Sequence, residues 1–364
     1  MLIFPESRKK ILVTGGAGFI GGAFIRNLLM TTQMKIYCID KMGYASDLTS
    51  VTKTISLLGD KAKDRFTFIN SNIADKIALE KAIDISDPDI VVHLAAESHV
   101  DRSISNPSIF VESNIIGTFN LLQSLLNHWE NLTKERKNNF RIIHISTDEV
   151  FGSLGESGYF VETSSYDPRS PYSASKASAD HLVKAWFHTY NLPIIVSNCS
   201  NNFGPWQFPE KLIPTAVIKA STNKNIPIYG DGRNIRDWLF VEDHVDALQA
   251  IINKGKIGES YCIGSQNEKS NKQIVQLICK VLDKQRPDLA PHSKLIKYVS
   301  DRPGHDHRYA IKPLKISREL SWKSKSNFQE CLENTVIWYL NNSTWIETVM
   351  QKSNYKGERL GLNV

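Results

Sequence analysis

Residues Lys10 to Gly22 read KILVTGGAGFIGG, and this stretch decides the fold. The apolar run KILVT predicts a buried strand, and Phe19 to Leu29 has the pattern of a helix. Between them, Gly15, Gly18 and Gly21 are spaced by three. In a dinucleotide-binding turn the first glycine permits the tight turn and the second lets the backbone approach a pyrophosphate. The third lets the helix pack closely on the strand. The order of strand, glycine turn and helix therefore predicts a dinucleotide site at a helix N-terminus.

Asp40 is a second indication of the cofactor. It closes the apolar segment that begins at Lys35 and predicts the next strand. An acid at this point hydrogen-bonds the ribose hydroxyls of a dinucleotide and repels a 2′-phosphate, so it favours NAD over NADP. A plain strand-to-helix turn with a strand-ending acid is the alternative. We favour the NAD site because strand, turn, helix and acid all agree.

Strand and helix patterns alternate through the first half of the chain. The predicted strands are Lys10 to Thr14, Lys35 to Asp40, Arg65 to Asn70, Asp89 to Leu94, Arg141 to Ser146 and Pro193 to Asn198. The predicted helices are Phe19 to Leu29, Ile77 to Ile83, Val111 to Trp129 and Tyr172 to Tyr190. This alternation predicts an α/β fold with a doubly wound parallel Rossmann sheet.

The texture of the sequence changes after about Asn201, where proline and glycine become frequent and aromatic and charged residues are interleaved. We predict an NAD-binding Rossmann domain over residues 1–200 and a smaller, mainly substrate-binding region over residues 201–364. Two segments of the second region, 235–241 and 260–264, are predicted to return to the first domain as strands.

Composition excludes several classes of protein. The chain has 364 residues, of which 41% are hydrophobic and 23% charged, as in ordinary globular proteins. The net charge of +6 is small and dispersed, so it gives little support to nucleic-acid binding. No two of the five cysteines form a C-x-x-C pair, which favours free thiols in a reducing compartment. The longest apolar runs have the length of strands. We therefore expect a cytoplasmic protein that does not bind membranes.

Tyr172 and Lys176 open a predicted helix as Y-S-A-S-K. Positions i and i+4 lie on one face of a helix, so the phenol and the ammonium can point into one cavity. A free phenol has a pKa of about 10 and is a poor base at neutral pH. A nearby cation and a positive nicotinamide ring are expected to lower that pKa. An exposed helix pair is the alternative, and the preceding dinucleotide pattern argues against it.

Thr147, Asp148 and Glu149 follow the predicted strand Arg141 to Ser146. In a doubly wound sheet the carboxyl ends of the strands form the ligand crevice. A solvated loop would explain one acid at this place. Two adjacent acids beside Thr147, with Tyr172 close behind, are better explained as an acid/base pair.

These residues together resemble the extended short-chain dehydrogenase/reductase superfamily, and within it the nucleoside-diphosphate-glucose 4,6-dehydratases. Almost the whole chain takes part in the resemblance. The segments that carry it are TGGAGFIGG, IDKMGYASDL, HLAAESHVDRSI, STDEVFG, SPYSASKASADHLV, NCSNNFGPWQFPEKLIP, IYGDGRNIRDWLFVEDH and DRPGHDHRYAI. Sugar-nucleotide epimerases share the glycine turn and the Tyr/Lys pair but usually lack the Asp-Glu pair, which is the most specific dehydratase feature.

The resemblance implies two sets of binding residues. The NAD site would contain Gly15, Gly18, Phe19, Ile20, Gly21, Asp40, Lys41, Met42, Gly43, Asn72, Ile73, Leu94, Ala95, Ala96, Glu97, Ser98, Ser113, Tyr172, Lys176 and Asn202. The nucleotide-sugar site would contain Ser98, Thr147, Asn201, Lys211, Leu212, Pro227, Ile228, Tyr229, Arg236, Asn271, Asp301, Arg302, Pro303, Gly304 and His305. Arg236 and Arg302 are natural pyrophosphate clamps. Asn72 departs from the aspartate usual in the family but keeps an acceptor oxygen for an adenine amino group. No metal site is expected, and His305-Asp306-His307 is interpreted as part of the sugar-nucleotide loop.

The resemblance also implies a reaction, with Thr147, Asp148, Glu149, Tyr172 and Lys176 as its catalytic residues. Tyr172 takes the proton of the glucose 4-hydroxyl while hydride leaves C4 for NAD, and Thr147 hydrogen-bonds the same oxygen. Glu149 removes the C5 hydrogen, Asp148 protonates the departing 6-hydroxyl, and hydride returns to C6. The net change is loss of water, and the product is a 4-keto-6-deoxy sugar nucleotide.

Several alternatives stay open at the level of sequence. The preferred substrate is dTDP-glucose, giving dTDP-4-keto-6-deoxyglucose. Because Trp206-Gln207 resembles UDP-glucose 4,6-dehydratases of UDP-rhamnose formation, UDP-glucose is the alternative. A sugar-nucleotide epimerase or a non-catalytic NAD-binding protein is more distant. The resemblance further implies a homodimer through the helices Val111 to Trp129 and Tyr172 to Tyr190.

Overall fold

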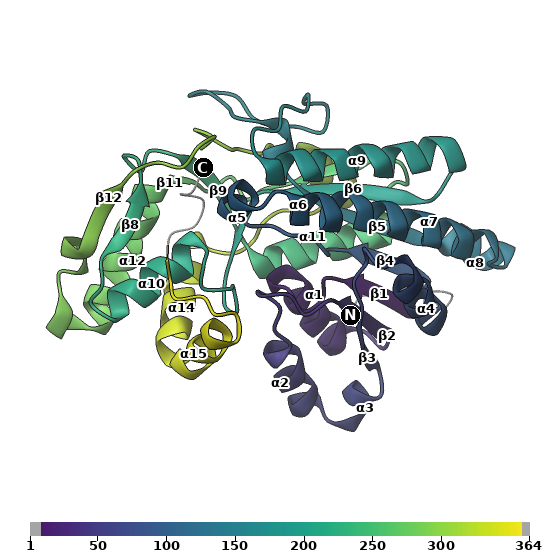
Figure 1. Cartoon of the computed structure of the whole chain (residues 1–364), viewed down its shortest axis with the longest axis horizontal. Helices are drawn as coiled ribbons and strands as arrows, with labels where there is room; N and C mark the ends of the chain where they lie inside the picture. The colour runs from purple at the N-terminus through teal and green to yellow at the C-terminus, as the bar shows by residue number, and fades with distance from the viewer. Residues whose placement is uncertain (1–8, 359–364) are drawn as a thin grey trace.

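A seven-stranded parallel sheet is the centre of the molecule (Figure 1). The computed structural model describes residues 9–358, so the outer limits of both predicted domains lie outside the described residues. Neighbouring strands pair in the order β10-β6-β5-β4-β1-β2-β3, and every pair is parallel. The strands are β1 (Lys10–Thr14), β2 (Lys35–Asp40), β3 (Phe66–Asn70), β4 (Ile90–His93), β5 (Arg141–Thr147), β6 (Ile194–Cys199) and β10 (Ser260–Ile263). The predicted fold class is confirmed.

Helices cover both faces of this sheet because its strands are apolar on both sides. Ile11 and Val13 of β1 enter one buried cluster, whereas Leu12 enters the cluster on the opposite face. The first face is covered by α1 (Phe19–Thr31), α2 (Thr49–Leu58), α3 (Asp60–Lys63) and α11 (Val241–Lys254). The second face is covered by α4 (Lys76–Ser86), α7 (Gly117–Glu130) and α9 (Pro171–Tyr190). The strand order reverses between β1 and β4, which opens a crevice at the carboxyl ends of the strands.

The helix that ends in α7 (Gly117–Glu130) is longer than the sequence predicted. It runs through α6 (Ser108–Phe110), a π-helical segment (Val111–Ile116) and α7 without a break. These 23 residues are long and apolar enough to cross a membrane, which the sequence analysis did not expect of any segment. In the structure 61% of the most apolar window is buried inside the protein, where the helix packs against α4 and α9.

The second region has its own core beside the large sheet (Figure 1). Its three-stranded sheet has the order β11 (Glu268–Ser270), β9 (Ile235–Phe240) and β7 (Asn201–Phe203), and a parallel pair joins β8 (Ile226–Tyr229) to β12 (Ile296–Val299). Its main helices are α10 (Leu212–Ser221), α12 (Asn271–Gln285), α14 (Phe328–Asn341) and α15 (Ser343–Lys352). The remaining short helices are α5 (Val100–Ser105), α8 (Lys134–Asn139) and α13 (Leu314–Leu320), with 3₁₀ turns at Asp148–Phe151, Pro287–Leu289 and His292–Leu295.

The two segments predicted to return to the first domain are paired differently. Residues 260–263 do join the large sheet, as β10 beside β6. Residues 235–240 form a strand, but β9 pairs with β7 and β11 instead of with the large sheet. The reason is that β9 lies between the two cores: Trp238 packs in the core of the second region and Leu239 in the core of the first. The division at residue 200 stays a prediction.

Candidate active site

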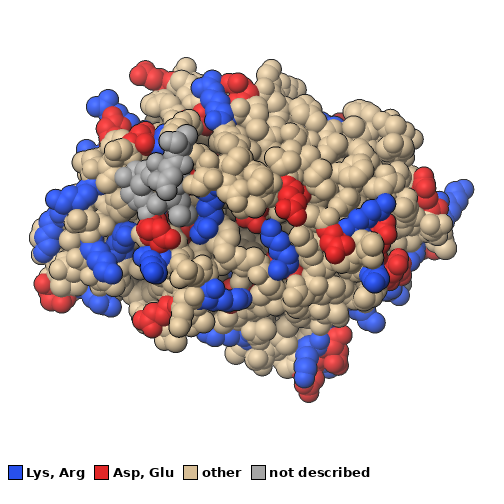
Figure 2. Space-filling model, in the orientation of Figure 1, with Lys and Arg blue, Asp and Glu red and all other residues tan. Residues whose placement is uncertain are grey.

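Two adjoining cavities occupy the crevice at the carboxyl ends of the strands. Their volumes are about 310 Å³ and 220 Å³. We call them the glycine-turn cavity, which contains the turn after β1, and the arginine cavity, which contains Arg236 and Arg302. Both are lined by Ser98, Glu149, Asn201, Asn202, Gln207, Glu210 and Lys211, so they form one continuous site. Basic and acidic side chains are intermixed on the face seen in Figure 2.

The glycine turn has the backbone geometry that the sequence predicted. Gly15 has a φ of +71°, and a Cβ there would lie 2.5 Å from the backbone nitrogen of Ala95. A Cβ on Gly21 would overlap the carbonyl oxygen of Gly15. Gly18 is the N-cap of α1 and gives the helix no side-chain cap. The first turn of α1 therefore presents free N–H groups to the cavity, as a phosphate site requires.

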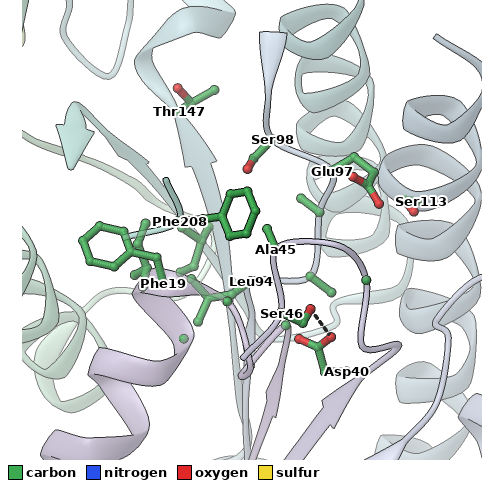
Figure 3. A pocket seen from close by; sticks show the side chains of 18 of the residues that line it. Phe19, Asp40, Ala45, Ser46, Leu94, Glu97, Ser98, Ser113, Thr147 and Phe208 are labelled. Atoms are coloured by element: carbon green, nitrogen blue, oxygen red, sulfur yellow. Dashed lines mark hydrogen bonds between the residues drawn. The ribbon is translucent and has the colours of Figure 1, made fainter. Parts of the chain in front are cut away.

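Asp40 organises the loop that follows β2. Its Oδ2 accepts from the backbone of Ala17 at 3.1 Å, and its Oδ1 accepts from the backbone of Met42 at 2.9 Å and from the hydroxyl of Ser46 at 2.8 Å. Figure 3 shows Asp40 and Ser46 on the wall of the glycine-turn cavity. Asp40 is therefore placed to meet a ribose, and it also holds the loop in shape.

The structure brings together nearly all of the predicted cofactor residues. Every residue of the predicted NAD set lines the glycine-turn cavity except Met42, whose backbone instead turns away with a φ of +54°. Lys41 pairs with Glu97 at 2.6 Å and donates to the hydroxyl of Ser113 at 2.9 Å. The Oδ1 of Asn72 accepts from the backbone of Ala74 at 3.0 Å, so the amide is oriented by its own loop.

Tyr172 and Lys176 lie at the base of this cavity on the first turns of α9. Ser170 caps the helix and Pro171 is its first residue, which explains why the helix begins there. The ammonium of Lys176 is buried and donates to the carbonyl oxygen of Ile145 at 2.8 Å. Burial lowers the pKa of Lys176, an effect that the carboxylate of Asp180 opposes.

The expected lowering of the Tyr172 pKa does not occur in the protein alone. Burial raises that pKa well above its usual value, and the charge of Glu149 raises it further. The hydrogen bond with Thr147 lowers the pKa of Tyr172 but does not offset these effects. In the protein alone, desolvation of the buried phenolate is the largest effect on this pKa. The expected lowering by a cation together with the positive nicotinamide ring of bound NAD stays a prediction.

The surroundings of Asp148 favour its protonated form. Its side chain is only 1% exposed, and burial raises its pKa well above the usual value, with Glu149 and Asp237 adding to the effect. The hydroxyl of Thr147 donates to its Oδ1 at 3.3 Å. Thr147 and Glu149 line the cavities, whereas Asp148 lies behind them and is not part of either wall.

Glu149 lines both cavities and faces three cations. The pKa of its carboxyl is raised, mainly by burial, although Arg302, Arg236 and Lys211 oppose the rise. Two adjacent carboxyls therefore have different environments, since Asp148 is buried beside other acids and Glu149 is opposed by basic groups. Such a difference is what separates a proton donor from a proton acceptor in an acid/base pair.

The arginine cavity presents two cations toward Glu149. Arg302 pairs with Asp101 at 2.7 Å, and Asp101 also accepts from Tyr229 at 2.8 Å. Arg236 is fixed by carbonyl oxygens, with 2.7 Å to Ile235 and 3.1 Å to Asp306. Because Arg236 makes no salt bridge within residues 9–358, its charge is available to an anionic ligand.

Most of the predicted sugar-nucleotide residues line this site, but three do not. Thr147 lines the glycine-turn cavity, and the others of the set line the arginine cavity, except for Asp301, Pro303 and Gly304. These three residues belong to the loop 301–305 but do not line a cavity. Asp301 accepts from His305 at 2.6 Å, and Gly304 has a φ of +63°, where an added Cβ would lie 2.8 Å from the carbonyl oxygen of Arg169.

Sequence reasoning missed several lining residues. The larger ones are Tyr44, Phe208, Glu210, His99, Asp101, Tyr309 and Tyr355. Most lie inside motifs that the sequence analysis quoted, such as IDKMGYASDL and PEKLIP, so their position in a motif was the available signal. Phe208 stands beside Ala45 in Figure 3, where the second region closes over the loop after β2.

Comparison with known proteins agrees with this geometry. A family model described as GDP-mannose 4,6 dehydratase matches residues 12–335. The dTDP-glucose 4,6-dehydratase of Neisseria meningitidis is 49% identical, over 97% of this chain and 99% of that protein. The dTDP-glucose 4,6-dehydratase of Bacillus anthracis, solved in complex with NAD, is 40% identical with a TM-score of 0.81 over 94% of this chain and 99% of that one. DesIV of Streptomyces venezuelae, a dTDP-glucose 4,6-dehydratase solved with NAD and TDP bound, is 36% identical with a TM-score of 0.84 over 93% and 99%. With the model matched over most of its length and relatives aligned from end to end, the chain belongs to the nucleotide-sugar 4,6-dehydratase family.

Proposed function

We propose that the protein is an NAD-dependent hydro-lyase that converts dTDP-glucose to dTDP-4-keto-6-deoxyglucose. The observation that carries this proposal is the buried Asp148, whose pKa is raised by burial, next to the cavity-lining Glu149 and beside Tyr172. An epimerase has no need of such a pair, because it exchanges hydride at C4 without breaking the C6–O bond. A non-catalytic NAD-binding protein has no need to bury three ionisable groups around one cavity.

The residues present fit NAD. Asp40 faces the place of a ribose, the uncapped start of α1 faces the place of a pyrophosphate, and Lys176 lies at the inner end of the same cavity. The chemistry that NAD supplies when bound is reversible hydride transfer. The relatives solved with NAD support the assignment of this cofactor.

The chain's own residues handle the protons. Tyr172 receives the proton of the sugar 4-hydroxyl, and Thr147 donates a hydrogen bond at the same oxygen. Glu149 takes the C5 proton, and Asp148 gives its proton to the 6-hydroxyl, which leaves as water. The C5 proton is later returned, so the net change is the loss of one water molecule. Arg236 and Arg302 bind the pyrophosphate of the substrate.

The choice of dTDP-glucose over UDP-glucose is supported by the relatives, since those named above are dTDP-glucose 4,6-dehydratases. Trp206-Gln207 carried the resemblance to the UDP-glucose enzymes. Trp206 lines neither cavity, and its ring packs 4.7 Å from that of Trp338 and 5.3 Å from that of Trp345 against the second core. Gln207 lines both cavities, so UDP-glucose stays the alternative.

The test is to incubate the purified protein with dTDP-glucose and with UDP-glucose separately. We expect the 4-keto-6-deoxy product from dTDP-glucose, without added NADH, and a higher kcat/KM than for UDP-glucose. A preference for UDP-glucose would reverse the choice of nucleobase. Formation of a 4-epimer without loss of water would replace the dehydratase by an epimerase.

We further propose a cytoplasmic homodimer. Four apolar side chains are exposed on the outer surfaces of α9 and of the continuous helix 108–130: Val111, Ile116, Phe119 and Tyr190. The ring of Phe119 lies against Trp186, so the two helices form one apolar surface. A second copy of the chain would cover it. Sedimentation of the wild type against Phe119→Asp tests this, and a monomeric wild type would contradict it. The five free cysteines support a reducing compartment.

A further inference from the structure

The carboxylate of Asp180 is completely buried beneath the proposed catalytic residues. Tyr172, Lys176 and Asp180 are spaced by four on α9, so they lie along one face of the helix. The phenol and the ammonium face the glycine-turn cavity, whereas Asp180 lies one turn further from it. A carboxylate that lies inside a protein without exposure needs a specific set of partners to remain charged.

Asp180 has that set of partners, and two of them come from the end of β5, which carries Thr147. Its Oδ1 accepts from Nε2 of His144 at 3.0 Å, and its Oδ2 accepts from the hydroxyls of Ser146 at 2.7 Å and Tyr166 at 3.0 Å. The amide of Asn198 lies 3.5 Å from Oδ2 and also donates to the carbonyl oxygen of Thr147 at 3.2 Å.

The arrangement connects Asp180 to Lys176 through β5. His144 and Ser146 flank Ile145 in the strand, and the carbonyl oxygen of Ile145 accepts from the Lys176 ammonium at 2.8 Å. Asp180 thus binds His144 and Ser146, the two neighbours of Ile145, whose carbonyl oxygen accepts from the Lys176 ammonium. A shift of this strand end would move Ile145 and the backbone of Thr147 together.

The charges around Lys176 leave Asp180 as its effective counter-ion. From β4 and β5, burial lowers the pKa of His93 and of His144, so both rings are neutral. From β6, burial raises the pKa of Cys199 to about 12, and from the loop before α9 it raises that of Tyr166. Burial also raises the pKa of Asp148, and Lys184 donates to the hydroxyl of Tyr166 at 3.1 Å. The pKa of Asp180 is lowered in spite of its burial, because His144, Lys176 and Ser146 all favour its ionised form.

We propose that Asp180 is a positioning residue for the dehydratase reaction: it fixes the end of β5 against α9 and keeps the Lys176 ammonium charged and in place. This inference rests on the proposed function, in which Lys176 supports the cofactor and Tyr172. Asp180 contacts neither cavity and acts only through these neighbours.

Removing the charge of Asp180 has a specific consequence. Asp180→Asn keeps the size of the side chain and deprives Lys176 of its counter-ion, so the ammonium loses its proton at lower pH. The alkaline limb of the kcat–pH profile should move down by about one pH unit or more. Asp243, a buried acid that accepts from Ser324 and Ser326 far from the cavities, provides the matched control. Asp243→Asn should leave the profile in place.

The experiment compares three proteins: the wild type, Asp180→Asn and Asp243→Asn. For each, kcat for dTDP-glucose is measured from about pH 6 to about pH 10, in steps of roughly half a pH unit. The affinity for NAD is measured over the same range, because Lys176 faces the cofactor cavity and this readout does not need turnover. A folded Asp180→Asn with the wild-type alkaline limb in both readouts overturns the proposal. If the wild type binds NAD but does not turn over, the proposed function fails, and the NAD readout still decides the role of Asp180.

A second variant covers the case in which Asp180→Asn does not fold. Asp180→Asn/Lys176→Met removes the buried cation together with its counter-ion, so it contains no unpaired charge. We expect this double variant to have a higher Tm than Asp180→Asn alone, and to fold even if the single variant does not. A double variant that is no more stable than the single one would show that charge pairing with Lys176 is not what Asp180 provides.

Discussion

The hydroxyl of Thr147 donates to one oxygen of the Asp148 carboxyl at 3.3 Å, while the other oxygen is buried and makes no hydrogen bond within residues 9–358. A buried carboxylate oxygen without a donor is costly, whereas a protonated carboxyl lowers that cost. This arrangement agrees with the raised pKa of Asp148. Burial therefore favours the protonated form of Asp148, which is the form that can give a proton to a leaving group.

Asp148→Asn tests this role. The amide keeps the size of the side chain but cannot protonate the departing 6-hydroxyl. Oxidation at C4 does not require this proton, so we expect the 4-keto intermediate and bound NADH to accumulate. Absorbance of reduced nicotinamide during a single turnover would show the accumulation, with a fall in kcat of about 10²–10⁴. Wild-type rates of product formation would remove Asp148 from the mechanism.

Glu149→Gln tests the partner base. Its carboxylate faces Arg302, Arg236 and Lys211, which favour the ionised form. Without a base, the C5 hydrogen is retained. We expect exchange of that hydrogen with deuterated solvent to stop and product formation to be nearly abolished. Normal exchange in this variant would mean that another group removes the C5 proton.

Tyr172→Phe removes the proposed base for the 4-hydroxyl. Burial raises the pKa of Tyr172 in the free protein, so the phenol is neutral until ligands change its surroundings. We expect kcat to fall by about 10²–10⁴ with little change in the affinity for substrate. Rapid-mixing absorbance should then show no reduced nicotinamide at all, in contrast to Asp148→Asn. An early absorbance burst in Tyr172→Phe would contradict the assignment.

The sequence predicted the sheet and most of the cofactor cavity for identifiable physical reasons. The Gly15 turn and Asp40 are local features, since both follow directly from a strand end. The partners of β9 and the position of Trp206 depend on contacts between distant segments, which periodicity does not contain. The rise in the pKa of Tyr172 in the protein alone was not anticipated, because it comes mainly from burial, which the sequence does not give directly. Glu210 was missed for the same kind of reason, because its partners lie more than one hundred residues away.

Asp40→Asn tests cofactor choice. The neutral side chain no longer repels a 2′-phosphate, but it retains an acceptor for the backbone of Ala17 or Met42. We expect the ratio of NAD affinity to NADP affinity to fall. We also expect NAD itself to bind more weakly, because part of the loop contacts is lost. Isothermal titration with each dinucleotide measures the ratio. Turnover of the wild type that is supported equally by NADP would contradict the role of Asp40.

Glu210 joins the cofactor loop to the second region, and this contact leads to a prediction about retention of NAD. Its carboxylate accepts from the hydroxyl of Tyr44 at 2.7 Å and from Arg102 at 2.9 Å, and the guanidinium of Arg102 lies 3.7 Å from the centre of the Tyr44 ring. Trp345 on α15 holds the same loop by donating to Asp47 at 2.9 Å. We expect the loop to separate from these partners when the dinucleotide leaves.

Tyr44→Phe removes the hydrogen bond to a carboxylate while keeping the ring under Arg102. Hydrogen bonds to charged groups contribute roughly 1.5–3 kcal/mol, so release of NAD should become about ten-fold faster or more. Tyr298→Phe, at an exposed position on β12, is the matched control and should release NAD at the wild-type rate. Because the proposed reaction returns its hydride before product leaves, faster release should also uncouple the cycle, so that free 4-keto sugar and NADH appear in solution. An unchanged release rate in Tyr44→Phe would show that the loop does not have to open at this contact for the cofactor to dissociate.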